Sequence, residues 1–201
     1  MTHPHARTAK RSLGQNFLQD QNVARKIVSL LEIEPEDRVL EIGPGHGALT
    51  RFVLQAGPEY TAALEKDFDL APKLKRDNPD LGVIIGDGLT FAWSSLRGGW
   101  KILGNLPYNV ASPIIWSLAE QGWGVARAVF MVQKEVGQRL TAQPGNKTYG
   151  ALTVWVQSFF RAKTGFIVGP KVFRPRPKVD SSVVVFSPLR GQGETPDFDP
   201  K

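Results

Sequence analysis

The sequence predicts an α/β fold, in which a doubly wound, mostly parallel sheet carries helices on both faces. Short apolar runs alternate along the chain with segments of helical periodicity. A glycine-rich turn, Gly43 to Gly47, directly follows the apolar run 38–42, and glycines at such a place let a ligand approach the backbone closely. A chain of 201 residues is long enough for one domain of this kind with a substantial core.

The elements are predicted in order from periodicity and from the residues that start or stop them. A helix is expected over 19–31, because its apolar residues recur every three to four positions and Asp20 can cap its start. A helix over 48–55 is ended by Gly57 and Pro58. Strands are expected at 38–42, 60–64, 82–85, 101–104, 128–132, 165–168 and 182–186, and further helices up to residue 74 and at 113–120, 135–140 and 151–160.

The composition is that of an ordinary globular protein with an excess of positive charge. Hydrophobic residues make up 41% and charged residues 22%, and the formal net charge is +6. This excess is compatible with a polyanionic partner but identifies none. Cysteine is absent, which excludes disulfides, thiolate metal ligands and cysteine nucleophiles. The histidines are His3, His5 and His46, so we expect no metal site.

The two ends of the chain differ in character from its middle. Residues 1–12 are predicted to form a flexible basic arm with Arg7, Lys10 and Arg11, and residues 190–201 a polar tail or a truncated linker. A single folded domain is expected over 13–189. Because no apolar run approaches the ~20 residues needed to cross a bilayer and the start is polar, we expect a cytoplasmic protein without a membrane partner. We also expect a monomer.

Acidic residues follow the predicted strands in a pattern that suits a nucleoside ligand. Glu65 ends one strand, where a carboxylate can hold two ribose hydroxyls, and Asp87 follows the next, where it can accept from an adenine amino group. Glu41 places negative charge just before Gly43 and the rest of the turn, which favours a cationic ligand. S-adenosylmethionine has a ribose, an adenine, an ammonium and a sulfonium but no phosphate, so we predict it as the cofactor.

A nicotinamide dinucleotide is the competing cofactor, because its binding fingerprint also has a glycine turn followed by an acidic residue. The spacing here is Gly43-X-Gly45-X-Gly47, which is not the pattern that sets a pyrophosphate on a helix N-terminus. Singly, Asp87 could be a plain turn residue and Glu65 a helix cap. Their occurrence at successive strand ends, with Asn105 at the next, favours the methyl donor.

The tetrapeptide Asn105-Leu106-Pro107-Tyr108 follows the strand 101–104 and suits the holding of a planar amino group. The Asn105 side-chain oxygen and the Leu106 carbonyl can both accept hydrogen bonds from an exocyclic amine. Pro107 biases Leu106 toward an extended conformation, which would aim that carbonyl outward. Tyr108 can stack on the ring. Alone, an Asn-X-Pro step is also compatible with an ordinary solvent-facing turn.

A basic segment lies toward the end of the predicted domain. It contains six basic residues and no acidic ones: Arg161, Lys163, Lys171, Arg174, Arg176 and Lys178. A solvated charged face is the ordinary explanation. Beside a base pocket, the alternative is a rim that contacts RNA phosphates, to which Arg7, Lys10 and Arg11 would add, and we favour this rim.

Several motifs, taken in order, resemble one family. They are Leu13 to Leu18, Glu41 to Gly47, Glu65, Asp87, Asn105 to Tyr108, Gln133 to Val136 and Phe173 to Ser181. Over about residues 12–188 the chain resembles the KsgA-type small-subunit ribosomal RNA adenine N6,N6-dimethyltransferases. The resemblance implies a class I S-adenosylmethionine-dependent methyltransferase fold, Rossmann-like, which makes 13–189 the catalytic domain. It further implies a chain that lacks the family's small C-terminal helical domain.

The resemblance also implies an activity and a set of site residues. The activity is dimethylation of two adjacent adenines in a hairpin loop near the 3′ end of small-subunit rRNA, with the immature small ribosomal subunit as partner. The residues that would line the cofactor are Asn16, Leu18, Gly43, Glu65, Asp87 and Asn105. Phe173 would stack on the extruded base opposite Tyr108, although a core aromatic is the alternative. Prolines at alternate positions after Phe173 favour an extended segment.

Two other functions remain possible from the sequence. One is the antibiotic-resistance type of large-subunit rRNA adenine methyltransferase, which would have a similar pocket. The other is a non-catalytic ribosome-assembly or RNA-binding factor that keeps the fold. The intact Asn105 to Tyr108 motif argues against the second, and the Pro177 to Ser181 run favours the small-subunit group over the first.

Overall fold

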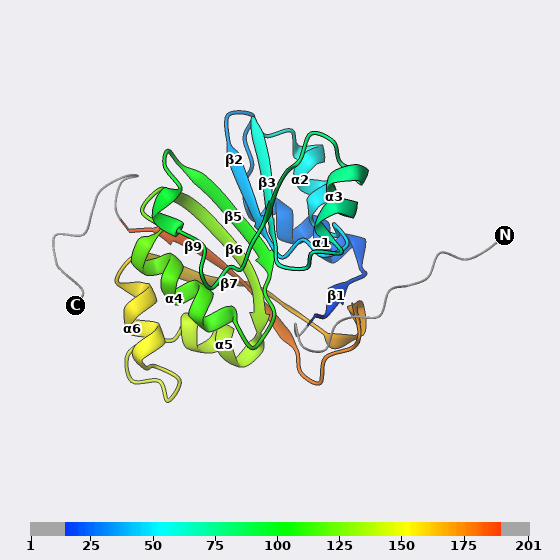
Figure 1. Ribbon diagram of the computed structural model, residues 1–201. Coiled ribbons are helices and arrows are strands. Elements are labelled where there is room, and N and C mark those ends of the chain that lie inside the picture. The colour runs from blue at the N-terminus through cyan, green and yellow to red at the C-terminus, as the bar shows by residue number, and fades with distance from the viewer. Residues whose placement is uncertain (1–14, 190–201) are drawn as a thin grey trace.

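The computed structural model describes residues 15–189, which form an α/β structure in three layers (Figure 1). The strands are β1 (Phe17–Leu18), β2 (Arg38–Ile42), β3 (Tyr60–Glu65), β4 (Gly82–Ile85), β5 (Trp100–Asn105), β6 (Val125–Gln133), β7 (Phe160–Val168), β8 (Phe173–Arg174) and β9 (Ser181–Pro188). The helices are α1 (Gln21–Ser29), α2 (Thr50–Ala56), α3 (Ala71–Asp77), α4 (Ala111–Gln121), α5 (Lys134–Leu140) and α6 (Ala151–Gln157), with 3₁₀ turns η2 (Trp93–Ser95) and η3 (Pro170–Val172).

Seven strands form one sheet in the order β4-β3-β2-β5-β6-β9-β7. The pairs from β4 to β6 are parallel, and β9 is antiparallel to both β6 and β7. The chain runs outward from β2 to β4 and then returns to β5 on the other side of β2. The carboxyl ends of β2 and β5 therefore meet where the strand order reverses, which is where ligands bind in open sheets. The predicted doubly wound, mostly parallel sheet is confirmed.

Alternate residues of the central strands enter two separate cores. Leu40 and Ile102 pack with residues of α4, α5 and α6 on one face, whereas Val39 and Leu103 pack with residues of α1 and α2 on the other. The period of two along each strand produces this division. Helices thus cover both faces of the sheet (Figure 1).

Two of the predicted helix boundaries have the expected cause. The Asp20 carboxylate accepts hydrogen bonds from the backbone N–H groups of Asn22 and Val23 at 2.8 and 3.1 Å, so it caps α1. Gly57 ends α2 with φ +71°, a left-handed conformation that favours glycine.

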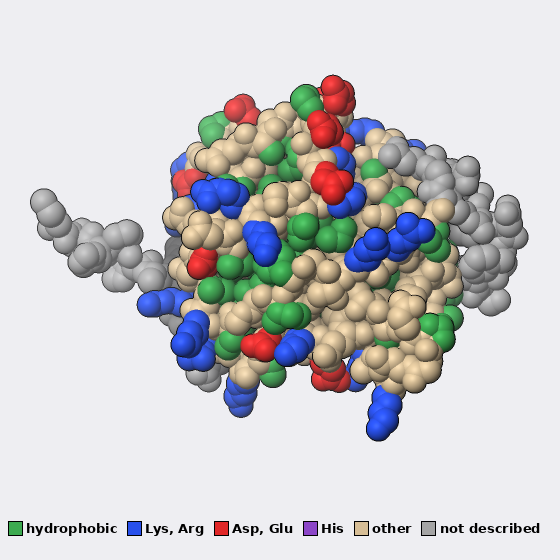
Figure 2. Space-filling view, turned by 180° about the vertical axis from the view of Figure 1, so that it is seen from behind, with side chains coloured by type: hydrophobic (Ala, Val, Ile, Leu, Met, Phe, Trp, Pro, Cys, Tyr) green, Lys and Arg blue, Asp and Glu red, His purple; other side chains and the backbone are tan. Residues whose placement is uncertain are grey.

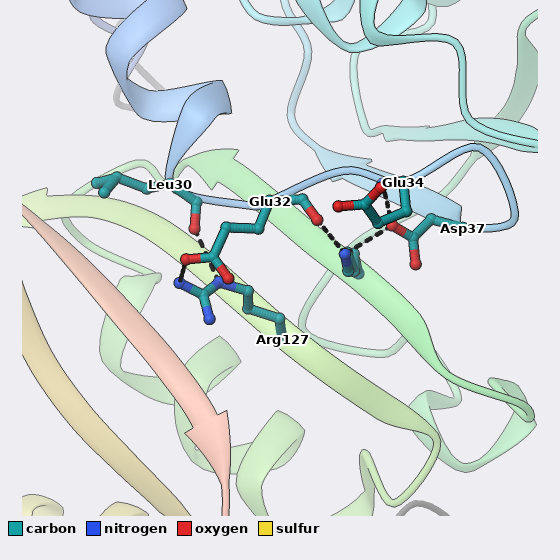
Figure 3. Close-up of polar contacts among 6 residues, drawn as sticks. Leu30, Glu32, Glu34, Asp37 and Arg127 are labelled. Atoms are coloured by element: carbon teal, nitrogen blue, oxygen red, sulfur yellow. Dashed lines mark hydrogen bonds and ion pairs between the residues drawn. The ribbon is translucent and has the colours of Figure 1, made fainter.

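Ion pairs fasten the connection between α1 and β2 to the amino ends of the central strands (Figure 3). The Arg127 guanidinium donates to the Leu30 carbonyl at 2.8 Å and to the Glu32 carboxylate at 2.6 Å. Lys101 lies 2.6 Å from the Asp37 carboxylate. Acidic side chains also gather at the top of Figure 2, the end at which the parallel strands begin. The cations of β5 and β6 at this end are therefore already paired with carboxylates.

The structure corrects the predicted elements near residues 157–174. The predicted helix over 151–160 ends at Gln157, and the predicted strand over 165–168 begins earlier, at Phe160. β7 pairs with β9 along its whole length, from Phe160 opposite Pro188 to Val168 opposite Ser181, and this pairing holds it extended. The two-residue strands β1 and β8, which pair antiparallel, were not predicted because two residues carry no periodicity.

Within residues 15–189, no group of histidine or acidic side chains is arranged to hold a metal ion. None of the helices in that range has the length and apolar character of a membrane span.

Candidate active site

A cavity of about 130 Å³ lies at the carboxyl ends of β2, β3, β4 and β5. Its lining includes most of the residues predicted for the site: Asn16, Gly43, Glu65, Asp87, Asn105, Leu106, Pro107 and Tyr108. They come from four strand ends and from the segment before β1, and the strand order brings them together. The sequence separated these residues by up to 92 positions, from 16 to 108.

The glycine turn forms one wall of this cavity. Gly43, Gly45 and Gly47 have φ values of +63°, +57° and +78°, which residues with a side chain rarely adopt. A Cβ on Gly45 would also lie 2.9 Å from the Phe17 ring. The turn therefore requires glycine for its shape and, at Gly45, for close packing against Phe17.

Glu65 is held by the backbone around it. Its two carboxylate oxygens accept from the Gly45 N–H at 3.0 Å and from the Asp67 N–H at 2.8 Å. Burial raises the pKa of Glu65, although these hydrogen bonds oppose the shift. A carboxylate has about four acceptor positions, so the fixed group keeps acceptor capacity toward the cavity.

Asp87 forms an ion pair that the sequence did not suggest. The Lys66 ammonium lies 2.7 Å from one Asp87 oxygen, and the Leu89 N–H donates to the other at 3.0 Å. Burial alone would raise the pKa of Asp87, but the hydrogen bonds from Lys66 and Leu89 and the Lys66 charge outweigh it and lower that pKa. Lys66 also lines the cavity, and it is the only cation among the described residues that do so.

The amide of Asn105 has a defined orientation. Its Nδ2 donates to the Asn16 backbone carbonyl at 2.8 Å. Because the amide is planar, this bond fixes the direction of Oδ1 as well. The next residue, Leu106, is itself held in place, because its side chain is buried and its N–H donates to the Met131 carbonyl at 3.1 Å. The Pro107 carbonyl accepts from two N–H groups at the start of α4.

The Tyr108 ring is half-buried, and its hydroxyl forms a hydrogen bond of 2.8 Å with the Ser181 hydroxyl. Burial raises the pKa of Tyr108, and the bond to Ser181 opposes that shift. Ser181 opens β9, whose antiparallel direction brings its first residue to the edge where the parallel strands end. Sequence reasoning missed both Ser181 and Lys66, because no spacing rule connects them with their partners.

Glu41 lies beneath the glycine turn, fully buried, at a smaller cavity of about 30 Å³ that Gly43 and Asn105 also line. The Thr50 hydroxyl donates to its carboxylate at 2.6 Å. Burial, which exceeds the opposing effect of that bond, raises the pKa of Glu41 to about 7, and the Glu65 charge adds to the rise. The negative charge predicted before the turn is thus strongly desolvated.

Two predicted residues lie elsewhere. Leu18 is buried and lines the cavities around the glycine turn rather than the main one. Phe173 is only 2% exposed and packs in the core that contains α1 and α2. The prediction that Phe173 offers a ring face to a base does not agree with the structure, because pairing of β8 with β1 turns this side chain into the core.

The basic residues predicted to contact RNA divide into two groups. Lys171, Arg174, Arg176 and Lys178 are exposed, around β8 and in the segment before β9. Arg7, Lys10 and Arg11 lie outside the described residues.

Comparisons with known proteins identify the family of the chain. The family model described as "Ribosomal RNA adenine dimethylase" matches residues 6–198. A Maridesulfovibrio salexigens protein named ribosomal RNA small subunit methyltransferase A is 54% identical over 95% of this chain and 73% of its own length. A protein of the same name from Nitratidesulfovibrio vulgaris is 50% identical over 90% of this chain and 70% of its own length.

Solved structures share the fold. A dimethyladenosine transferase from Plasmodium falciparum has a TM-score of 0.77 at 29% identity, over 86% of this chain and 63% of that one. The 23S rRNA methyltransferase ErmE has a TM-score of 0.76 at 28% identity, over 88% of this chain and 73% of that one. The fold is that of S-adenosylmethionine-dependent methyltransferases, and the chain belongs to the ribosomal RNA adenine dimethylase family.

Proposed function

We propose that this chain transfers methyl groups from S-adenosylmethionine to the N6 amino groups of two adjacent adenines in the 3′-terminal hairpin loop of small-subunit rRNA. The immature small subunit is the proposed partner, and residues 13–189 are the proposed catalytic domain. The observation that carries the proposal is the single cavity shared by Glu65, Asp87 and Asn105. The names of the Maridesulfovibrio salexigens and Nitratidesulfovibrio vulgaris relatives support the choice of RNA.

The chemistry of the cavity fits a nucleoside that bears positive charge and no phosphate. Its polar lining consists of carboxylates, amides, Tyr108 and glycine backbone, and its one described cation, Lys66, is paired with Asp87. Glu65 is placed to accept from ribose hydroxyls, and Asp87 to accept from the adenine amine. When bound, S-adenosylmethionine supplies an electrophilic methyl group on its sulfonium.

Asn105 and Leu106 act on the target amine. The nitrogen of an adenine amino group is a poor nucleophile, because its lone pair is delocalised into the ring. Two acceptors, Asn105 Oδ1 and the Leu106 carbonyl, would draw the amine hydrogens out of plane and localise that pair. The Asn16 carbonyl prepares this arrangement by holding Asn105 Nδ2. Catalysis then depends on positioning and electrostatics rather than on a strong base.

Tyr108 is the residue proposed to stack on the extruded base. Extrusion costs a few kcal/mol, and stacking on one aromatic ring returns about 1–3 kcal/mol. The bond to Ser181 fixes the ring in advance, which reduces the entropy lost on stacking. Phe173 has no part in this proposal, because its ring is buried.

One experiment tests the activity itself. Tritiated methyl transfer to precursor small subunits is measured, and the modified positions are then identified by sequencing. Modification of two adjacent adenines near the small-subunit 3′ end is expected. Transfer to a large-subunit adenine would instead support the function named for ErmE, whose fold is similar. RNA binding without any transfer would leave only a binding role.

Two substitutions test the site residues. Asn105→Ala should lower transfer by about 10²–10³-fold, as loss of one oriented polar group does in other active sites, while the matched change Asn146→Ala in an exposed loop should not.

Glu65→Ala should weaken donor binding by roughly 1.5–3 kcal/mol for each charge-assisted hydrogen bond lost. Glu59→Ala, an exposed glutamate just before β3, is its control in calorimetry. Full transfer by Asn105→Ala, or unchanged donor affinity in Glu65→Ala, would contradict these roles.

A further inference from the structure

A second, larger cavity lies against the other side of the glycine turn. Its volume is about 460 Å³, and it is lined by the β1–α1 connection, the turn, α2 and α3. It shares Gly45 with the proposed donor cavity, but Glu65, Asp87 and Asn105 do not line it. The proposed transfer chemistry therefore leaves this cavity without a role.

Arg51 lines this cavity from α2. Its Nε is buried and has no hydrogen-bond partner among the described residues. The guanidinium lies over the Phe52 ring, with Cζ 4.6 Å from the ring centroid, so an aromatic face supports it. No carboxylate of residues 15–189 lies within ion-pair distance of Arg51. Among the described residues, the Arg51 guanidinium is therefore a cation without a carboxylate partner in the wall of this cavity.

A second cation, Lys73, lines the same cavity from α3. It too lacks an ion pair within the described part of the chain. Burial and the Lys73 charge lower the pKa of His46, and the Asp67 charge partly opposes this shift. The His46 ring is therefore neutral at pH 7. Asp77 is the only carboxylate that residues 15–189 contribute to the lining. Two cations against one carboxylate leave one net positive charge.

Arg51 and Lys73 have no ion-pair partner among the described residues, whereas the basic residues at the opposite edge of the sheet do. Lys101 and Arg127 are each paired with a carboxylate, as Figure 3 shows for Arg127. A guanidinium and an ammonium that line one cavity can match the oxygens of a phosphate group, which accept several charge-assisted hydrogen bonds at once. The volume also exceeds that of a phosphate and leaves room for the attached sugar.

We propose that the cavity between the glycine turn and α3 binds a backbone phosphate of the RNA substrate, through Arg51 and Lys73. Because the cavity adjoins the donor site at Gly45, this contact would hold the RNA next to the methyl donor. The choice of RNA rests on the proposed function, whereas the phosphate chemistry rests on the lining residues alone.

The test measures RNA affinity and its dependence on salt, with an RNA hairpin that contains the 3′-terminal loop of small-subunit rRNA and fluorescence anisotropy as readout. Arg51→Ala and Lys73→Ala should each weaken binding by roughly tenfold, and each should reduce the slope of log affinity against log salt by about 0.9. The control is Arg76→Ala, which removes an exposed cation of α3 that does not line the cavity. Lys73 is itself exposed, so its replacement should leave folding intact.

Three results would overturn the proposal. An equal loss with Arg76→Ala would show that only overall charge matters. A loss of S-adenosylmethionine affinity in calorimetry with Arg51→Ala or Lys73→Ala would assign the cavity to the donor. Competition by millimolar inorganic phosphate, with RNA slopes unchanged in the variants, would assign it to a small anion. Because binding is measured without methyl transfer, a wild-type protein that binds RNA in this way but transfers nothing would refute only the proposed activity.

Discussion

Replacement of the buried Glu41 by glutamine should stabilise the protein, and by an amount that depends on pH. Burial raises the pKa of Glu41 from 4.5 to about 7. Each pH unit between these values corresponds to about 1.4 kcal/mol, so the ionised carboxylate lowers the free energy of unfolding by roughly 3 kcal/mol. Between these values the folded state binds more protons than the unfolded state. The protonated Glu41 side chain therefore contributes its full stability to the wild-type protein below pH 4.5, and this contribution is lost as the pH rises to about 7.

Glutamine keeps the acceptor for the Thr50 hydroxyl but carries no charge at any pH. Urea unfolding at several pH values, followed by tryptophan fluorescence, should give equal stabilities for Glu41→Gln and wild type near pH 4.5. The variant should gain roughly 3 kcal/mol by pH 8. Glu34→Gln, at an exposed glutamate, is the matched control and should show no such trend. A stability difference that is the same at pH 5 and pH 8 would refute the reasoning.

Three further substitutions test other parts of the structure. Asp20→Ala should lower the free energy of unfolding by about 1 kcal/mol in urea titrations, because two N–H groups of α1 lose their cap; an unchanged midpoint would contradict the cap. Gly104→Ala should cost about 1–3 kcal/mol in the same assay, since its Cβ would lie 2.7 Å from the Ile42 carbonyl on the neighbouring strand. Lys66→Met should raise calorimetric affinity for S-adenosylmethionine by up to about fivefold, because an exposed ion pair worth about 0–1 kcal/mol no longer competes for Asp87; weaker binding would instead assign Lys66 a direct contact with the donor.

The sequence predicted those parts of the fold that follow from local pattern. The parallel strands were predicted, because each apolar run of four or five residues is bounded by turn residues, whereas their order in the sheet was not predicted. The start of α1 at Asp20 and the end of α2 at Gly57 followed from capping rules. The beginning of β7 was not predicted, because residues 160–164 are held extended by pairing with residues of β9 that lie 20 to 28 positions later. Such long-range pairing leaves no local signal.

The candidate site was predictable to the same extent. Residues at strand ends, such as Glu65 and Asn105, were found because parallel topology brings the carboxyl ends of neighbouring strands to one edge. The partners that orient them were not found, since Lys66 and Ser181 depend on side-chain contacts between elements. Phe173 was placed at the site by the family resemblance, and the structure buries it instead. The pairing of β1 with β8 that buries it spans 155 positions, from 18 to 173, so no local pattern indicated it.

Because β9 is antiparallel to the other central strands, the residue that holds Tyr108 comes from a different part of the chain than the proposed donor site. The proposed donor site lies at the carboxyl ends of the parallel strands β2 to β5, and residues of these strands also form the core. The tyrosine proposed to stack on the base is instead hydrogen-bonded to Ser181, directly after the loop 175–180, most of which is exposed. Changes in the length or composition of that loop could retune which nucleic acid is accepted, while the grip on the methyl donor stays as it is.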